Sequence, residues 1–157
     1  MSDQVPLTLK GKARIEQELR KLKTEDRKKI IEAIAVARDH GDLKENAEYH
    51  SAREKQSFIE GRIQNLEDKI ARAELIDPSK IKSDKIMFGA TLVLENEEGE
   101  EVSYQIVGEP EADLKEGRIA ITSPLARCLL GKKEGDEAVL KTKTTETCYE
   151  VVSVEYK

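Results

Sequence analysis

Four carboxylates gather in one short stretch of the chain, and they are the side chains best suited to chemistry. Asp39, Asp42, Glu45 and Glu48 lie in or beside residues 41–49, which read Gly-Asp-Leu-Lys-Glu-Asn-Ala-Glu-Tyr. Mg²⁺ prefers oxygen ligands and is commonly held by one or two carboxylates, while waters and substrate groups complete its shell. Asp42 and Glu45 lie three residues apart at a reversal of the chain, so both could point beyond it. Because two exposed carboxylates alone would hold Mg²⁺ weakly, another molecule would have to complete such a site.

The same spacing also has a purely structural explanation. Gly41 can adopt the left-handed conformation that ends a helix. Asp42 can accept hydrogen bonds from the free N–H groups at the start of the next helix, and Glu45 then fits the second half of a capping box. Judged on spacing alone, a capping turn is the stronger interpretation, and it is compatible with metal binding by the same residues.

Other catalytic chemistries have little support. The two histidines, His40 and His50, flank residues 41–49, and neither cysteine, Cys128 or Cys148, lies near them in the sequence. A Gly-rich phosphate loop, zinc-ligand spacing and a dinucleotide fingerprint are all missing. The histidines are therefore interpreted as exposed residues, and the cysteines as reduced thiols.

The composition favours an elongated, well-solvated protein. Of 157 residues, 38% are charged and only 4% are aromatic. Residues 1–77 hold 16 basic and 16 acidic side chains, whereas residues 78–157 hold 11 and 16. A protein that coats nucleic acid is normally basic, so any nucleic-acid contact is expected to be local. Since the sequence has neither a signal-peptide pattern nor an apolar stretch of membrane-spanning length, we expect a cytoplasmic protein without membrane contacts.

Two long helices are predicted on either side of residues 41–49. The first begins after Pro6-Leu7-Thr8, with Thr8 as its N-cap, and runs to about Asp39; its apolar pattern drifts by one residue near Asp26. The second ends at Ile76-Asp77-Pro78-Ser79, because Pro cannot continue a helix. The apolar positions follow steps of four and three: Ile15, Leu19, Leu22, Ile30, Ile34 and Ala37, then Ala52, Gln56, Ile59, Ile63, Leu66, Ile70 and Ala73.

Such narrow apolar seams are suited to pack against each other. Residues 1–76 are therefore expected to form an antiparallel coiled-coil hairpin. If the reversal is centred near residues 45–46, cross-helix neighbours have numbers that sum to about 91. Arg38 would then face Arg53, and Lys29 would face Arg62. These pairs would form a basic strip suited to phosphates, unless they are solvated or paired with nearby acids.

A second domain is predicted at residues 85–157, after a linker at 77–84. Short β-branched runs separated by turn signals predict strands at 91–94, 102–107, 118–121, 138–140 and 149–154. One short helix is expected between them, with Ser123 as N-cap, Pro124 at the first position and Gly131 beyond its end. The fold class is therefore α+β, with a small, mostly antiparallel sheet that carries one short helix.

The carboxylate-rich stretch resembles the bacterial Gre transcript cleavage factors. The most specific part is residues 41–50, followed by Ala52-Arg53-Glu54 and Glu60-Gly61-Arg62-Ile63. The resemblance covers essentially the whole chain, through Pro6-Leu7-Thr8, Phe88-Gly89-Ala90-Thr91, Ile106-Val107-Gly108, Glu111-Ala112-Asp113, residues 123–127 and residues 151–156. It implies an N-terminal coiled coil and a C-terminal domain with an FKBP-like fold.

The resemblance also implies a partner, bacterial RNA polymerase. In the family, the coiled coil enters the polymerase secondary channel and the C-terminal domain docks on the channel rim. The tip then stabilises a second Mg²⁺ in the polymerase active site, where the 3′ end of backtracked RNA is hydrolysed. The implied residues are Asp42 and Glu45 for the metal, Arg38 and Arg53 for the RNA, and Ser123 and Pro124 for the rim.

The expected role is that of an accessory factor, not an enzyme. It would bind no cofactor tightly, share Mg²⁺ with the polymerase active site and be monomeric when free. The short basic strip and acidic second domain favour the less basic of the family's two paralogues. The main alternative is an inhibitor of the same architecture, against which the intact Asp42 and Glu45 argue. A peptidyl-prolyl isomerase would need an aromatic-lined pocket, and a plain structural coiled coil would need no particular carboxylates at its tip.

Overall fold

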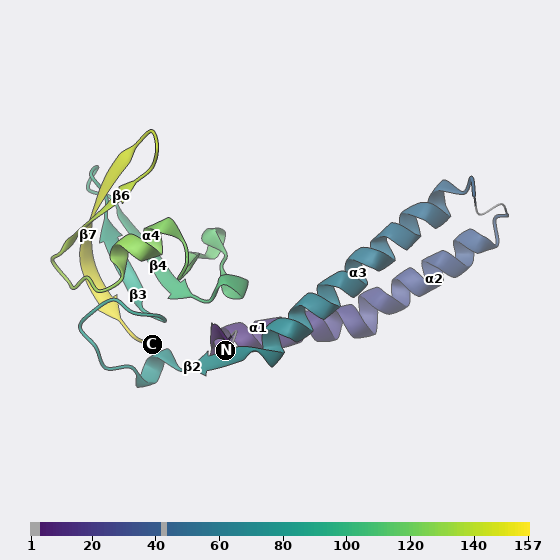
Figure 1. Ribbon diagram of the computed structural model, residues 1–157, viewed down its shortest axis with the longest axis horizontal. Helices are drawn as coiled ribbons and strands as arrows, with labels where there is room; N and C mark the ends of the chain where they lie inside the picture. The colour runs from purple at the N-terminus through teal and green to yellow at the C-terminus, as the bar shows by residue number, and fades with distance from the viewer. Residues whose placement is uncertain (1–3, 42–43) are drawn as a thin grey trace. The chain divides into compact units, whose positions relative to one another are not determined.

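The computed structural model describes residues 4–41 and 44–157, which group into two compact units (Figure 1). One unit is Ala13–Arg72. The other combines the described residues before Ala13 with Ala73–Lys157. This division differs from the predicted ranges 1–76, 77–84 and 85–157, because the residues on both sides of the helical unit pair with each other.

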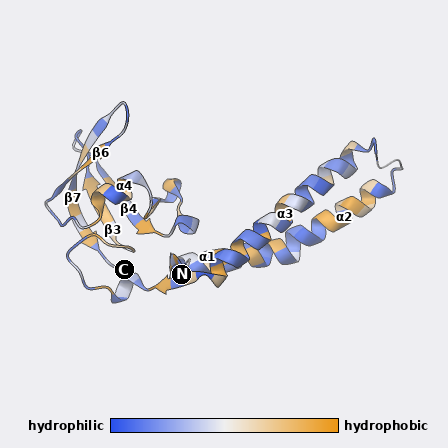
Figure 2. Ribbon diagram, in the orientation of Figure 1, coloured by the Kyte–Doolittle hydropathy of each residue, from blue (hydrophilic) through white to orange (hydrophobic). Residues whose placement is uncertain are grey.

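The Ala13–Arg72 unit is an antiparallel helical hairpin. Its first stretch consists of the part of α1 (Leu9–Lys21) from Ala13 onward, the π-helical turn η1 (Leu22–Asp26) and α2 (Arg27–Arg38), and it returns through α3 (Ala47–Ala71). Figure 2 shows hydrophobic residues concentrated on α2. Its buried seam contains Ile15, Leu22, Ile30, Ile34, Ala37, Ala52, Ile63 and Leu66. The predicted coiled-coil hairpin is confirmed.

The π-helical turn explains the drift in the apolar pattern near Asp26. A π turn holds about one residue more than an α turn. Leu22 and Ile30 are eight residues apart, one more than a heptad, and yet they are only 8% and 7% exposed. The turn η1 therefore absorbs the extra residue and returns Ile30 to the seam.

The helical stretch begins as predicted and ends earlier than predicted. Thr8 caps α1, since the Gly11 N–H donates to Thr8 Oγ1 at 3.0 Å. The return helix α3 ends at Ala71, and the prediction that it continues to about Ile76 with Ala73 in the seam is wrong. Ala73 instead opens strand β2 (Ala73–Ile76), which pairs in parallel with β1 (Val5–Thr8). The backbone groups satisfied by this ladder take these residues out of the helix.

The other unit is built on a five-stranded sheet of order β5-β4-β3-β7-β6. Its strands are β3 (Thr91–Glu95), β4 (Glu101–Val107), β5 (Arg118–Ala120), β6 (Glu137–Lys141) and β7 (Glu146–Glu155). Only the β4–β5 pair is parallel among the described strands of this sheet. The helix α4 (Pro124–Leu129) and the 3₁₀ turns η2 (Pro78–Lys80), η3 (Glu109–Glu111) and η4 (Leu114–Glu116) complete the unit. The predicted sheet with one short α-helix is confirmed.

The core of this unit lies between the sheet and α4. Its buried side chains are Ile86, Ala90, Leu92, Leu94, Ile106, Ile119, Ala126, Leu129, Ala138 and Val151. Tyr104 and Tyr149 pack against this core. Across the described ranges, no helix is long and apolar enough to span a membrane.

A buried carboxylate ties β1 to the region that follows β4. Glu111, only 5% exposed, accepts hydrogen bonds from the Thr8 N–H at 2.9 Å, from the Thr8 hydroxyl and from the Gly108 N–H at 3.1 Å. A Cβ atom at Gly11 would overlap the Glu111 side chain, and one at Gly108 would overlap the Pro6 carbonyl oxygen. Glycine is therefore required at both close approaches.

Candidate functional site at the tip of the helical hairpin

The tip connects α2 to α3 through a short loop. Gly41 has a φ of +112°, a conformation that ends the first stretch and that other residues rarely adopt. The expectation that Gly41 breaks the helix is confirmed. Asp42 lies outside the described residues, so its predicted role stays a prediction. Glu45 lies within them, and its side chain is exposed.

The cap of the return helix is Asn46. Its Oδ1 accepts a hydrogen bond from the Tyr49 N–H at 3.1 Å, and its Nδ2 donates to the Ala37 carbonyl at 2.6 Å. One side chain therefore starts α3 and ties it to the end of α2. The predicted capping box from Asp42 to Glu45 is wrong, because Glu45 precedes the cap. The signal was in the sequence, since Asn is a preferred N-cap and stands directly before the first helical residue.

Asn46 leaves the Glu45 side chain without a structural role. Among residues 4–41 and 44–157, that side chain makes no hydrogen bond or ion pair. Asp39 and Glu48 are exposed as well, and Glu48 lies in the first turn of α3, where the helix dipole favours an acid. The described part of the tip thus presents a free carboxylate beyond the end of a capped helix.

Arg38 is held beside the tip by aromatic contacts. Its guanidinium carbon lies 5.9 Å from the centre of the Tyr49 ring, and the Tyr49 and His50 rings meet edge to face at 5.6 Å. His50 Nε2 lies 2.9 Å from the Lys44 carbonyl oxygen. Sequence reasoning missed Tyr49, whose position three residues after the Asn46 cap places it on the inner side of the hairpin. These contacts leave the polar edge of the Arg38 guanidinium available to an anion.

The register of the hairpin differs from the predicted one. Arg27 donates to Glu60 through two hydrogen bonds of 2.9 and 2.8 Å, and the numbers of these two residues sum to 87. Arg38 and Tyr49, a contact near the tip, give the same sum. The predicted sum of about 91 is wrong because the loop between α2 and α3 is centred near residues 42–43 rather than 45–46. Arg38 therefore lies about one turn away from the level of Arg53.

The second predicted basic pair does not form. Arg62 donates to Glu18 at 2.9 and 3.1 Å and is held away from Lys29. Lys29 instead borders an apolar hollow beside Phe58. Arg53, in contrast, is exposed and has no carboxylate partner among the described residues. The basic strip thus reduces to Arg38 and Arg53 near the tip.

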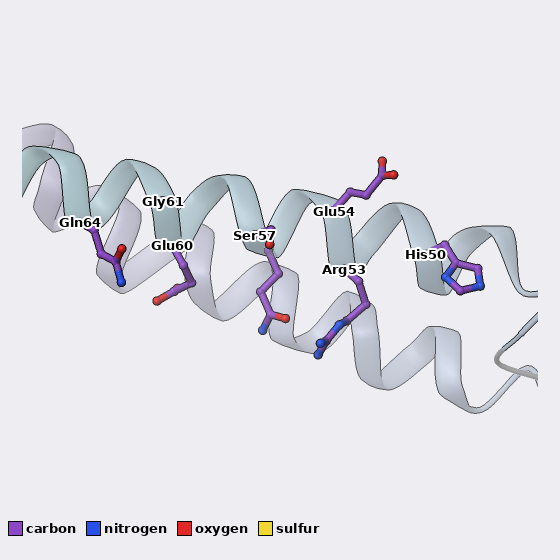
Figure 3. A pocket seen from close by; sticks show the side chains of 8 residues that line it. His50, Arg53, Glu54, Ser57, Glu60, Gly61 and Gln64 are labelled. Carbon is purple, nitrogen blue, oxygen red and sulfur yellow. The ribbon is translucent and has the colours of Figure 1, made fainter.

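A groove follows α3 away from the tip (Figure 3). It has a volume of about 700 Å³ and is lined by His50, Arg53, Glu54, Gln56, Ser57, Glu60, Gly61 and Gln64. Arg53, Glu60 and Gln64 project on one side of the helix, and Glu54 points away from them (Figure 3). All of these residues belong to α3.

Metal binding at the tip would need outside ligands. In the described parts of the chain, no three acidic, cysteine or histidine side chains are grouped so as to hold an ion. The oxygens of the exposed Glu45 are of the hard type that Mg²⁺ accepts. The described tip therefore suits an ion whose remaining ligands come from another molecule.

The residues predicted to contact the channel rim lie at the start of α4. The Ser123 hydroxyl caps this helix by accepting a hydrogen bond from the Ala126 N–H at 3.2 Å. Pro124 occupies the first helical position and is exposed. The predicted helix start is confirmed, and the rim contact stays a prediction.

Two known family models match this chain, one on each half. Residues 5–75 match the family "Transcription elongation factor, N-terminal", and residues 81–156 match "Transcription elongation factor, GreA/GreB, C-term". The "Transcription elongation factor GreA" of Halorhodospira halophila is 56% identical over 155 residues, with 98% of both chains covered. That of Xylella fastidiosa is 57% identical over 153 residues, with 96% of this chain and 97% of the relative covered. The solved GreA factor homolog 1 (Gfh1) of Thermus thermophilus is 26% identical, covers 97% of this chain and 99% of its own, and superposes with a TM-score of 0.45.

Proposed function

Because the chain belongs to the GreA/GreB family of transcription elongation factors, we propose that it acts on bacterial RNA polymerase as a transcript cleavage factor. The hairpin would enter the polymerase secondary channel and stimulate the Mg²⁺-dependent cleavage of backtracked RNA by the polymerase itself. The factor would then be an accessory protein rather than the nuclease.

The free Glu45 carboxylate is the observation that supports this proposal most directly. A tip built only to reverse the chain would use its acids as caps, but here Asn46 caps α3, and Glu45 is exposed and has no partner among the residues that the structure describes. Leaving a charged side chain solvated costs little, so Glu45 can offer both oxygens to a ligand. Asp42 is proposed to act with it on the strength of the sequence alone.

The role of each residue follows from the chemistry of phosphodiester cleavage. A Mg²⁺ ion held jointly by the tip and the polymerase would help to activate the attacking water and stabilise the leaving oxygen. Glu45 and Asp42 would supply carboxylate ligands, which explains why the chain needs no complete metal site of its own. Arg38, oriented by Tyr49, and the exposed Arg53 would hold the phosphates of the RNA near the tip.

Docking on the channel rim is proposed for the start of α4. Pro124 is exposed there, and the Ser123 cap fixes the backbone around it. Contact through Ser123 and Pro124 would position the factor without taking part in chemistry.

The test is RNA shortening in a stalled, backtracked elongation complex supplied with Mg²⁺. Glu45→Gln and Asp42→Asn keep the side-chain size and remove the charge, so each should slow stimulated cleavage by about tenfold or more while polymerase binding persists. Glu32→Gln removes an exposed acid from α2 and serves as the matched control.

Each result leads to a different conclusion. If the wild-type protein binds polymerase and slows it without shortening the RNA, the protein is an inhibitor and the proposal is wrong. If cleavage survives both tip substitutions, the factor stimulates cleavage by another route and the assignment of the tip fails.

A further inference from the structure

His50 forms a hydrogen bond that α3 does not need for its own start, which Asn46 already caps. His50 Nε2 lies 2.9 Å from the Lys44 carbonyl oxygen, across the end of the loop between α2 and α3. A carbonyl oxygen only accepts hydrogen bonds, so Nε2 is the donor and carries the proton in this bond. The His50 side chain is exposed, and Figure 3 shows its ring at the end of α3 that is nearest the loop.

This bond holds the peptide group that leads into Glu45. A peptide group is planar, so the Lys44 carbonyl and the Glu45 N–H can only turn together. On the other side, the Asn46 side chain is bonded to the Tyr49 N–H and to the Ala37 carbonyl. The backbone of Glu45 is thus held on both sides, whereas its carboxylate makes no bond to any described residue.

The His50 ring is itself held by its neighbours. It meets the Tyr49 ring edge to face, with 5.6 Å between the ring centres. The Tyr49 ring in turn has the Arg38 guanidinium 5.9 Å from its centre. A donor on a ring that packing already orients directs its hydrogen bond more precisely than one on a freely rotating side chain. The orientation of the Lys44 carbonyl is therefore linked, through two aromatic rings, to the end of α2.

We propose that His50 is a positioning residue for Glu45. The inference rests on the proposed function and adds to it a residue that acts through the backbone rather than on the metal or the RNA. A carboxylate whose backbone is already fixed loses less conformational freedom when it binds an ion. His50 is itself poorly suited as a ligand, because Mg²⁺ prefers oxygen donors and Nε2 is bonded to the Lys44 carbonyl. Loss of the bond should therefore raise the Mg²⁺ requirement of cleavage without removing a ligand.

Two substitutions of equal length separate the hydrogen bond from the bulk of the side chain. His50→Gln keeps an N–H donor near the position of Nε2, whereas His50→Met has none, and Gln and Met favour helices to a similar degree. His40→Met makes the same change in the other histidine beside the loop and is the matched control. The His40 side chain is exposed and makes no hydrogen bond to a described residue. Circular dichroism verifies that the full-length variants fold.

Cleavage of backtracked RNA is measured over a range of Mg²⁺ concentrations with saturating factor. His50→Met should raise the Mg²⁺ concentration for half-maximal cleavage by about fivefold, the factor expected for one lost hydrogen bond. His50→Gln should recover most of this loss, and His40→Met should behave as the wild type. When it is combined with Glu45→Gln, His50→Met should add little to the loss, because it acts through the Glu45 carboxylate.

Backbone amide relaxation of the free factor, measured by NMR, tests the positioning without the polymerase. His50→Met should lower the order parameter of the Glu45 N–H, and His50→Gln should restore it. Unchanged order parameters, an unchanged Mg²⁺ requirement or a full additional loss in the double variant would each overturn the positioning role and leave the tip function intact. No cleavage by the wild-type factor would instead overturn the proposed function and, with it, the part assigned to His50.

Discussion

At the scale of single residues, Asn46 takes the capping role at the tip, so Glu45 is not needed for it. The sequence pattern alone could not distinguish capping from metal binding at these positions. A capping turn and a metal-binding tip call for the same kinds of side chain in the same few positions. By capping α3 and bonding to the Ala37 carbonyl, Asn46 leaves Glu45 exposed. Competition between capping and ligation is thereby avoided for Glu45.

Removing the cap should weaken both the tip and its function. Asn46→Ala is expected to cost about 1 kcal/mol in the free energy of unfolding, the usual value for a lost N-cap. It should also reduce stimulated RNA cleavage although every carboxylate remains. Asn46→Asp keeps an acceptor for the Tyr49 N–H but cannot donate to Ala37, so it should recover helix stability better than cleavage. Urea unfolding by circular dichroism and the cleavage assay measure the two effects; full activity in Asn46→Ala would contradict the positioning role.

The buried Glu111 has a comparable structural role in the other unit. Glu111→Ala would leave the Thr8 N–H, the Thr8 hydroxyl and the Gly108 N–H without their acceptor. The expected loss is about 3 kcal/mol of unfolding free energy, since each buried unsatisfied group is costly. The exposed neighbour Glu109→Ala is the control. Equal urea midpoints for the two variants would show that Glu111 does not hold β1 in place.

At the scale of elements, the π-helical turn η1 determines which side of α2 packs against α3. It compensates for the eight-residue step from Leu22 to Ile30 and so keeps the seam continuous. The extra residue is predicted to be dispensable, because its removal would turn η1 into an ordinary α turn with a seven-residue step.

Single-residue deletions can test this account of η1. Deleting Thr24 should change the unfolding free energy by less than about 1 kcal/mol, because the seam regains heptad spacing. Deleting Glu32 instead rotates Ile34 and Ala37 by about 100° away from α3 and should cost several kcal/mol. Thermal unfolding of both variants decides the matter. If the Thr24 deletion is as damaging as the Glu32 deletion, η1 has another role.

The cross-helix pairs predict an acid-sensitive hairpin. Hydrogen bonding to the Arg27 guanidinium lowers the pKa of the Glu60 carboxyl below its ordinary value of 4.5. The folded state thus gains stability above pH 4.5 and loses it as the pH falls through the lowered pKa. Glu60→Gln should be less stable near neutral pH and should lose less stability on acidification. Helical circular dichroism during thermal unfolding at a series of pH values would reveal this, and parallel curves for the two proteins would argue against it.

At the scale of the whole molecule, charge is distributed unevenly. The net charge of −5 is carried by residues 78–157, whereas residues 1–77 balance. The sheet concentrates part of the excess in one row, since Glu101 pairs with Glu95, Glu95 with Glu150, and Glu150 with Glu137. Directly paired residues share a face, so four carboxylates follow one another across β4, β3, β7 and β6.

Reversing one charge in this row should stabilise the sheet. Glu150 has an acid on each side, so Glu150→Lys converts two repulsions into attractions, a gain of about 0.5–2 kcal/mol at low salt. The gain should shrink as salt screens the charges. Glu98→Lys makes the same charge change in the exposed turn outside the row and is the control. Urea unfolding at two salt concentrations would measure both variants; equal gains would attribute the effect to net charge alone.

The sequence determined the parts of this protein whose physics is local. Steps of four and three predicted the hairpin, β-branched runs between turn residues predicted the sheet, and Thr8 and Ser123 marked helix starts that the structure confirms. The carboxylates of the tip were visible for the same reason, because they lie in one short segment. The one-residue drift of the apolar pattern near Asp26 was also visible in the sequence, but the π turn that accommodates it was not.

Only the tertiary structure decided how distant segments meet. The pairing of β1 with β2, the register of α2 against α3 and the bonds of Glu111 depend on contacts between residues far apart in the chain. The observed register of the hairpin differs from the predicted one by about one helical turn. Arg38 and Arg53 still lie near the tip, but Arg62 pairs with Glu18 and is not part of the expected basic strip. The same structure showed that no described neighbour bonds to the Glu45 side chain, and a side chain is available for function only when its hydrogen bonds are not already taken. Composition and spacing can propose such a residue, and packing decides whether it is left exposed.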